Sequence, residues 1–165
     1  MHSAVEVLQV TGKITLKRKI DQNVAYLKYI INHKKKVFKT AWKRKQYIHA
    51  ITHDWDKFLP WVFIGYRRNF YPYTEKPSYA DSRAMTKQWQ KHYRRSKHHW
   101  QYWVVFNNFD DIRAIDIPYK YIQQMLADWE AMGKPVEYYF HNGSSMIFSD
   151  RTRYILDSEI AKMEM

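Results

Sequence analysis

The 165-residue chain contains no cysteine, which excludes disulfide bonds and thiolate metal ligands. Any metal ion would have to be held by nitrogen and oxygen atoms. Apolar runs of about 20 residues, the length that spans a bilayer, are also lacking. The N-terminal residues 1–6 have neither the basic nor the apolar part of a secretion signal. We therefore expect a single-domain cytoplasmic protein that has no membrane partner.

Acidic residues are scarce relative to basic ones. The chain has 28 Lys and Arg residues against 16 Asp and Glu, a formal net charge of +12, which attracts polyanions and phosphorylated small molecules. Residues 34–45 concentrate this charge and include no acid. Val37, Ala41 and Trp42 interrupt the run at helical spacing. This pattern favours a solvated helix face around a buried stripe over a nucleic-acid-binding surface.

Apolar residues repeat with the period of a helix over most of the chain. Tyr26, Ile30, His33 and Val37 fall at i, i+4, i+7 and i+11, so we expect a helix from Asp21 that buries this stripe, His33 included. Cap and stop residues predict the other helices. These run over 46–58 up to Pro60, from Ser78–Asp81 to about Trp103, from an Asp116 cap with Pro118 in the first turn to Gly133, and from an Asp150 cap to about Lys162.

Short β elements are expected near both ends of the chain. Residues 4–16 alternate around a Thr11-Gly12 break, and Asn142-Gly143 suits the turn of a small hairpin within residues 136–148. The predicted fold is a mostly α, single-domain helical bundle over residues 21–165, preceded by an N-terminal arm or short hairpin over residues 1–20.

One carboxylate lies on an otherwise apolar helix face. Tyr121, Met125, Asp128 and Met132 share a stripe of the predicted helix after Pro118. Removing a carboxylate from water without a partner costs several kcal/mol. Asp128 therefore requires a cation, a metal ion or strong hydrogen-bond donors beside it.

Histidine and aspartate residues recur along the chain in an order that suits a metal site. Imidazole and carboxylate groups bind borderline divalent ions, and the adjacent pair His53-Asp54 requires further ligands from elsewhere in the chain. Singly, each is more typical of a hydrogen-bonded core histidine or a salt bridge. Together, on core-facing stripes of different helices, they predict one metal centre. The candidate ligands are His33, His53, Asp54, His92, His98, His99 and Asp128.

This order resembles the HD superfamily of metal-dependent phosphohydrolases. In that superfamily a His, a His-Asp pair and a late Asp bind one metal ion, and extra histidines bind a second. The segment His53-Asp54-Trp55-Asp56-Lys57 is similar to the His-Asp-x-Gly-Lys segment of its cyclic-dinucleotide phosphodiesterase branch. Over residues 25–155 the pattern H…HDxxKF…H…HHWxYW…ADW is more closely similar to a family of bacteriophage and bacterial proteins that has no established activity.

The resemblance implies a role for each matching position. Four of them, His33, His53, Asp54 and Asp128, match the ligands of the first ion. His92, with His98 or His99, matches the second-ion histidines, and Lys57 matches the lysine that contacts phosphate. Asp54 and Lys57 are then the catalytic candidates in an HD-like metal-binding domain over residues 21–165. The candidate substrate-binding residues are Lys57, Arg94, Arg95 and Lys97. The implied cofactor is one or two divalent ions, Mn, Fe, Ni, Mg or Zn.

Three positions leave alternatives open. On an unbroken helix the Cα atoms of His92 and His99 would be about 10.5 Å apart, too far to serve two neighbouring ions. We therefore expect a break near Ser96, or only one of these histidines at the metal. Asp56 replaces a small residue of the motif, and it could pair with Lys57 or orient an imidazole. His49 is an alternative ligand, with a supporting role favoured.

Three functions fit these expectations. The first is hydrolysis of a nucleotide, cyclic nucleotide or other phosphate ester by metal-activated water. The second is oxygenation by an HD-type di-iron centre. The third is binding of nucleic acid or a nucleotide through the basic face, with a structural metal, as in a phage counter-defence factor. The sequence does not determine the oligomeric state.

Overall fold

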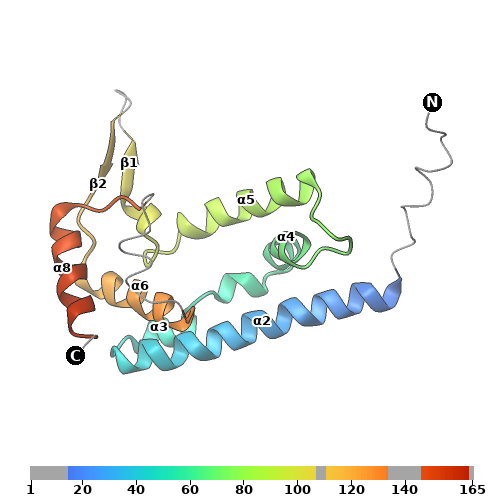
Figure 1. Ribbon diagram of the computed structural model, residues 1–165, viewed down its shortest axis with the longest axis horizontal. Helices are drawn as coiled ribbons and strands as arrows, with labels where there is room; N and C mark the ends of the chain where they lie inside the picture. The colour runs from blue at the N-terminus through green and yellow to red at the C-terminus, as the bar shows by residue number, and fades with distance from the viewer. Residues whose placement is uncertain (1–14, 107–110, 134–145, 164–165) are drawn as a thin grey trace.

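A 28-residue helix, α2 (Leu16–Lys43), runs along one edge of the molecule (Figure 1). It belongs to a computed structural model that describes residues 15–106, 111–133 and 146–163. The side chain of Thr15 caps the helix by accepting a hydrogen bond from the Arg18 amide. The helix therefore begins at Leu16 instead of Asp21, and residues 1–14 of the expected arm lie outside the described residues.

The buried stripe of α2 is confirmed. Tyr26, Ile30, His33 and Val37 are all buried, and Ala41 extends the stripe by one turn. The helix ends in a Schellman motif, in which the Gln46 amide donates to Ala41 O and the Lys45 amide to Trp42 O. Lys45 takes the left-handed conformation there, with φ 58°.

The predicted helix over 46–58 is wrong because the chain breaks at the His-Asp pair. Helix α3 covers only Tyr47–Thr52, and a 3₁₀ turn, η1, follows over Trp55–Phe58. Between them Asp54 adopts left-handed backbone angles, φ 55° and ψ 23°, which aspartate tolerates better than most residues.

Pro60 begins a helix that the sequence analysis did not predict. Helix α4 (Pro60–Phe70) has this proline in its first turn, where the lack of an N–H has no cost. It packs against α5 (Tyr79–Tyr93). Ser78 caps α5 in a capping box with Asp81, as expected.

The predicted extension of α5 to Trp103 is wrong. The helix ends at Tyr93, and a turn over residues 94–98 precedes the 3₁₀ turn η2 (Trp100–Trp103). The expected break near Ser96 is therefore present, and it separates His92 from His98 and His99.

A two-stranded antiparallel sheet follows in the middle of the chain rather than at its ends. Strand β1 (Val104–Phe106) pairs with β2 (Ile112–Ala114). The expected hairpins fall mainly in residues 1–14 and 134–145, which lie outside the described residues. This sheet was not predicted, because its strands are only three residues each.

The last two helices among the described residues carry different caps from those expected. Helix α6 (Tyr119–Ala131) has Pro118 at its N-cap position. Asp116 instead accepts a hydrogen bond from Ser149 Oγ at 2.7 Å. That same hydroxyl caps α8 (Asp150–Ala161) by accepting from the Thr152 amide. Asp150 therefore lies in the first turn of α8 and is not its cap.

Three apolar clusters stabilise this arrangement, and the candidate ligands lie where they meet. Tyr26 and Ile30 of α2 pack against α4, while Val37 and Ala41 pack against α3 and α6. A third cluster joins α6 to α8. His33 lies on α2 between the first two clusters. Within the described residues, no helix is long and apolar enough to cross a membrane.

Candidate metal centre

The backbone turn at Asp54 brings the two members of the His-Asp pair together. On a continuous helix, consecutive side chains point about 100° apart. Here His53 ends α3 and Asp54 is left-handed, so Nε2 of His53 lies 3.3 Å from Oδ2 of Asp54. Both side chains are almost completely buried. The pair therefore presents a nitrogen and an oxygen to the same point in the interior.

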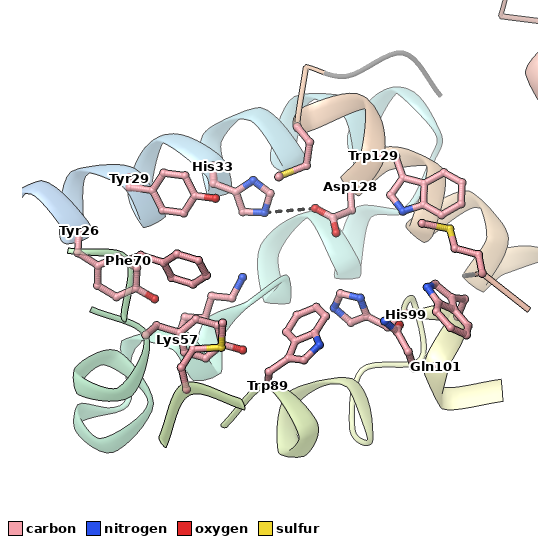
Figure 2. A pocket seen from close by; sticks show the side chains of 15 residues that line it. Tyr26, Tyr29, His33, Lys57, Phe70, Trp89, His99, Gln101, Asp128 and Trp129 are labelled. Atoms are coloured by element: carbon pink, nitrogen blue, oxygen red, sulfur yellow. Dashed lines mark ion pairs between the residues drawn. The ribbon is translucent and has the colours of Figure 1, made fainter. Parts of the chain in front are cut away.

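Helices α2 and α6 supply two further ligands to that point. Nε2 of His33 lies 3.2 Å from Nε2 of His53, 3.6 Å from Asp54 Oδ2 and 3.2 Å from Asp128 Oδ1. Asp128 Oδ1 lies 3.5 Å from His53 Nε2. Figure 2 shows His33 and Asp128 pointing toward each other across the cavity. The structure thus brings together the four residues expected to hold the first ion.

These four atoms have the spacing of a metal coordination shell. Ligands bound at about 2.1 Å to one ion lie about 3.0–3.4 Å from one another in octahedral or tetrahedral geometry. The five distances given above for His33, His53, Asp54 and Asp128 run from 3.2 to 3.6 Å. Asp128 Oδ1 is also buried without a hydrogen-bond partner among the described residues. The residues therefore fit a divalent ion better than they fit direct hydrogen bonding.

A second group of ligands lies on the other oxygen of Asp54. Nε2 of His92 lies 3.3 Å from Asp54 Oδ1 and 2.9 Å from Nε2 of His99. Asp56 holds the opposite side of the His92 ring, with Oδ2 2.9 Å from Nδ1. Asp54, His92 and His99 are therefore the residues that would hold a second ion.

The structure separates His98 from His99. His99 lines the same cavity as His33 and Asp128, whereas His98 lines a different cavity together with His49. His99 therefore fits the second ion. The cluster is called the carboxylate centre below, and it comprises His33, His53, Asp54, His92, His99 and Asp128. One nitrogen of His98 also lies within 4.8 Å of ligand nitrogens of His92 and His99. Distance alone therefore does not assign His98, whose ring also contacts those of His49 and His53.

Protons and Lys57 balance the buried carboxylates when no ion is bound. Burial opposes protonation of His33, but the neighbouring Asp128 and Asp54 carboxylates outweigh it and raise its pKa to about 9. His92 behaves alike: burial lowers its pKa, and Asp54 and Asp56 raise it to about 9. Burial and His92 lower the pKa of His99 to about 3. A bound cation could replace the two protons.

Lys57 projects into the cavity lined by His33, His99 and Asp128, called the main cavity because it contains the candidate ligands. It is bound to Asp54. Its Nζ lies 2.5 Å from Asp54 Oδ2. Burial would favour a neutral amine, but the Asp54 carboxylate raises the pKa of Lys57 above its ordinary value. Lys57 in turn lowers the pKa of the Asp54 carboxyl against the effect of burial. Of the two alternatives for Asp56, pairing with Lys57 is not the one observed, because its carboxylate contacts His92 instead.

The other three candidate substrate-binding residues lie away from this cavity. Arg95 and Lys97 are exposed and line the second cavity, and Arg94 lines a third one beside Tyr93. The Lys97 ammonium lies over the rings of Tyr102 and Tyr121. The structure therefore brings only Lys57 of the four to the carboxylate centre.

Sequence reasoning missed the aromatic walls of the main cavity, which has a volume of about 360 Å³. Tyr26 and Tyr29 precede His33 on α2, and Trp89 precedes His92 by one turn on α5 (Figure 2). Tyr26 was assigned to the core alone. Helical spacing to a metal ligand was the signal that could have identified these residues. Aromatic and sulfur-containing side chains make up most of the rest: Tyr66, Phe70, Met85, Trp100, Trp129, Met132 and Met146.

The basic run of α2 is partly engaged inside the fold. Lys34 Nζ donates to the carbonyl oxygens of Ile51 and His53 and so stabilises the end of α3. Arg44 contacts Glu130 and Gln123 of α6. These contacts give Lys34 and Arg44 structural roles, whereas Lys35, Lys36 and Lys39 are exposed.

The fold and its centre define a mostly helical protein with a buried histidine–aspartate cluster. Residues 22–162 match the family described as "Family of unknown function (DUF5662)". The chain belongs to this family. Searches of curated proteins and of solved structures find no match.

Proposed function

We propose that this protein is an HD-type metal-dependent phosphohydrolase. The observation that carries the proposal is the convergence of His33, His53, Asp54 and Asp128 at ligand-to-ligand distances of 3.2–3.6 Å. Their order along the chain and their origin on α2, α3 and α6 agree with the HD resemblance. The buried His92 at the second oxygen of Asp54, with the half-buried His99 beside it, supports a centre of two ions.

A divalent ion at this centre would lower the pKa of bound water to near neutrality and offset charge on phosphoryl oxygens. The chain's own residues position the substrate. Lys57 reaches the cavity from η1, and its ion pair with Asp54 fixes its Nζ beside the ligands. This ammonium binds one phosphoryl oxygen as a point charge. Asp56 fixes the ring of His92, so that its Nε2 is directed at the centre.

The cavity favours a substrate with one phosphoryl group and a flat ring. Of its lining residues that the structure describes, Lys57 alone is a lysine or arginine, so the site compensates little negative charge besides that at the metal. Tyr29 and Trp89 offer faces on which a nucleobase would stack. The volume of about 360 Å³ falls in the range of small-ligand sites. A nucleoside monophosphate or a cyclic mononucleotide fits these features.

The test combines metal analysis with a substrate screen. Wild-type protein is stripped with chelator, reloaded with Mn²⁺, Fe²⁺, Ni²⁺ or Zn²⁺, and assayed with nucleoside monophosphates and cyclic mononucleotides for phosphate or ring opening. We expect activity in wild type and its loss, together with an ion, in Asp128→Asn. Asp157→Asn, an exposed substitution on α8, is the control.

Two results would overturn the proposal. Failure of reloaded wild type to bind a stoichiometric ion would remove the metal centre. Oxygen uptake by the iron-loaded protein with an alcohol or phosphonate, without phosphate ester cleavage, would identify the oxygenase instead.

A further inference from the structure

Three buried histidines form a compact triangle beside the carboxylate centre. The ring centroids of His49 and His53 are 4.9 Å apart, those of His49 and His98 are 4.8 Å apart, and those of His53 and His98 are 4.9 Å apart. All three residues are buried. His49 comes from α3, and His98 from the turn after α5. The proposed hydrolysis does not use His49.

Each ring has a buried nitrogen that lacks a hydrogen-bond partner in the described part of the chain. These atoms are Nε2 of His49, Nδ1 of His53 and Nε2 of His98. A buried polar atom left unpaired costs about 1–3 kcal/mol, so three such atoms on rings that contact one another need an explanation that packing does not provide. One ligand nitrogen from each ring lies within 4.8 Å of those from the other two.

We propose that His49, His53 and His98 bind a transition-metal ion at a site of their own. A tetrahedral ion with Zn–N bonds of about 2.0–2.1 Å places the centroids of its imidazole ligands about 5 Å apart, close to the separations observed here. His53 belongs to both sites. Its Nε2 contacts the carboxylates, which leaves the unpaired Nδ1 for the histidine triangle. A neutral imidazole has one lone pair, so an ion at each nitrogen would require His53 to release its remaining ring proton to solvent and bind as an imidazolate.

An all-nitrogen ligand set selects the metal. Imidazole suits Zn²⁺, Co²⁺, Ni²⁺ and Cu²⁺, whereas Mg²⁺ and Mn²⁺ prefer oxygen ligands. Burial, with its neighbour His53, lowers the pKa of His49 to about 4, and burial with His99 lowers that of His98 well below its usual value. Nε2 of each ring is buried without a hydrogen-bond partner in the described part of the chain and is therefore available to an ion.

The site has its own access from solvent. A cavity of about 330 Å³ is lined by His49, His53 and His98, and also by the exposed Arg95 and Lys97. The aromatic residues of the main cavity do not line it. A water molecule could thus complete the coordination of the ion, and the ion could exchange without passing the substrate cavity.

The experiment counts ions in matched variants. Stripped proteins are reloaded with Zn²⁺ or Co²⁺ and desalted; bound metal is measured by elemental analysis and the Co²⁺ site by its visible absorption. We expect His49→Ala and His98→Gln each to lose about one equivalent and the tetrahedral Co²⁺ bands. Gln124→Ala, which alters the wall of the same cavity, should keep both.

The carboxylate centre is followed separately. Asp128→Asn should lose its ion there while retaining the ion and the Co²⁺ bands of the histidine triangle. Circular dichroism of the stripped proteins checks folding, and His49→Gln replaces His49→Ala where that variant unfolds. Unchanged stoichiometry and spectra in folded His49 variants overturn the histidine site and leave the proposed function standing. Unchanged stoichiometry in Asp128→Asn overturns the proposed function and leaves the histidine site standing.

Discussion

The carboxylate of Asp56 accepts a hydrogen bond from Nδ1 of His92 at 2.9 Å, while Nε2 of the same ring lies 3.3 Å from Asp54 Oδ1. A carboxylate in this position fixes the tautomer and the orientation of an imidazole, and it makes the free nitrogen a better metal ligand. The sequence analysis left open whether Asp56 would pair with Lys57 or orient a histidine, and the observed contact is the second.

Asp56→Asn should selectively lower the affinity of the protein for the second ion. Loss of such an outer carboxylate lowers metal affinity about 10- to 100-fold. Titration calorimetry of the stripped protein with Mn²⁺, which an all-nitrogen site does not favour, would show one of the two binding events at the carboxylate centre shifted by this factor. Asp157→Asn should bind as wild type does. Equal weakening of both binding events would contradict a role through His92 alone.

The left-handed backbone at Asp54 predicts a difference between two neutral replacements. Asparagine tolerates this conformation, whereas alanine incurs about 1–2 kcal/mol of strain there. In the presence of chelator, Asp54→Ala should therefore unfold at lower urea concentration than Asp54→Asn, by about 1 kcal/mol or more. Comparable unfolding free energies would show that the turn relaxes once the carboxylate is gone. Both variants should bind less metal than wild type.

Lys45 occupies the other left-handed position, with φ 58° at the end of α2. Glycine adopts this conformation without steric cost and is the common residue at this position, C′, of a Schellman motif. Lys45→Gly should raise the free energy of unfolding by about 1 kcal/mol and leave the metal content unchanged. Lys43→Gly, within the last turn of the same helix, should lower it. Urea denaturation monitored by circular dichroism measures both.

Lys57→Met should separate substrate binding from metal binding. Removing one preorganised cationic donor from a phosphoryl-transfer site costs about 10²–10³ in kcat by analogy with other charge-stabilising donors. Because Lys57 is not itself a ligand and its removal leaves the Asp54 carboxylate in place, the ion should remain, as elemental analysis would show. Lys57→Arg should recover part of the activity. Full activity in Lys57→Met would exclude its role at the phosphate.

The stripped protein should lose stability as the pH rises. His33 and His92 have a folded-state pKa of about 9 against roughly 6.5 in the unfolded chain. Their contribution is complete below pH 6.5 and is lost as the pH rises through 9, a decrease on the order of a few kcal/mol. The lowered pKa of His99 acts only below its unfolded value and does not oppose this trend.

Urea denaturation in chelator between pH 6.5 and 9 tests this dependence. His33→Gln should have a flatter profile than wild type. Added Zn²⁺ should reverse the slope, because an ion that displaces the two protons binds more tightly at higher pH. A flat profile for the stripped wild-type protein would show that these imidazoles are neutral.

Side-chain periodicity made much of the centre predictable. His33 lies on a stripe with Tyr26 and Ile30, and any regular helix that buries those residues also buries His33. The same argument placed Asp128 on the inner face of α6. His33 Nε2 lies 3.2 Å from its Oδ1, and an ion held between them would supply the partner that the carboxylate requires. Ligands on regular helices could thus be assigned before their distances were known.

Local backbone breaks were not predictable in the same way. Asp54 is left-handed without being glycine, so no composition signal marks the end of α3. Pro60 was interpreted as a stop, although proline is equally typical of the first turn of a helix. Which of His98 and His99 faces the carboxylates depends on the turn after Tyr93. A shift of one residue there exchanges the two side chains.

An ion bound by both His33 and Asp128 would also have a mechanical role, because the two residues lie far apart along the chain. Helices α2 and α6 would be tied together through it, much as a disulfide staples remote segments in secreted proteins. This chain has no cysteine with which to make such a link. Chelation would then act as reduction does on a disulfide-bonded domain: it opens a long loop and exposes α6 to proteases, and restoring the metal closes it again.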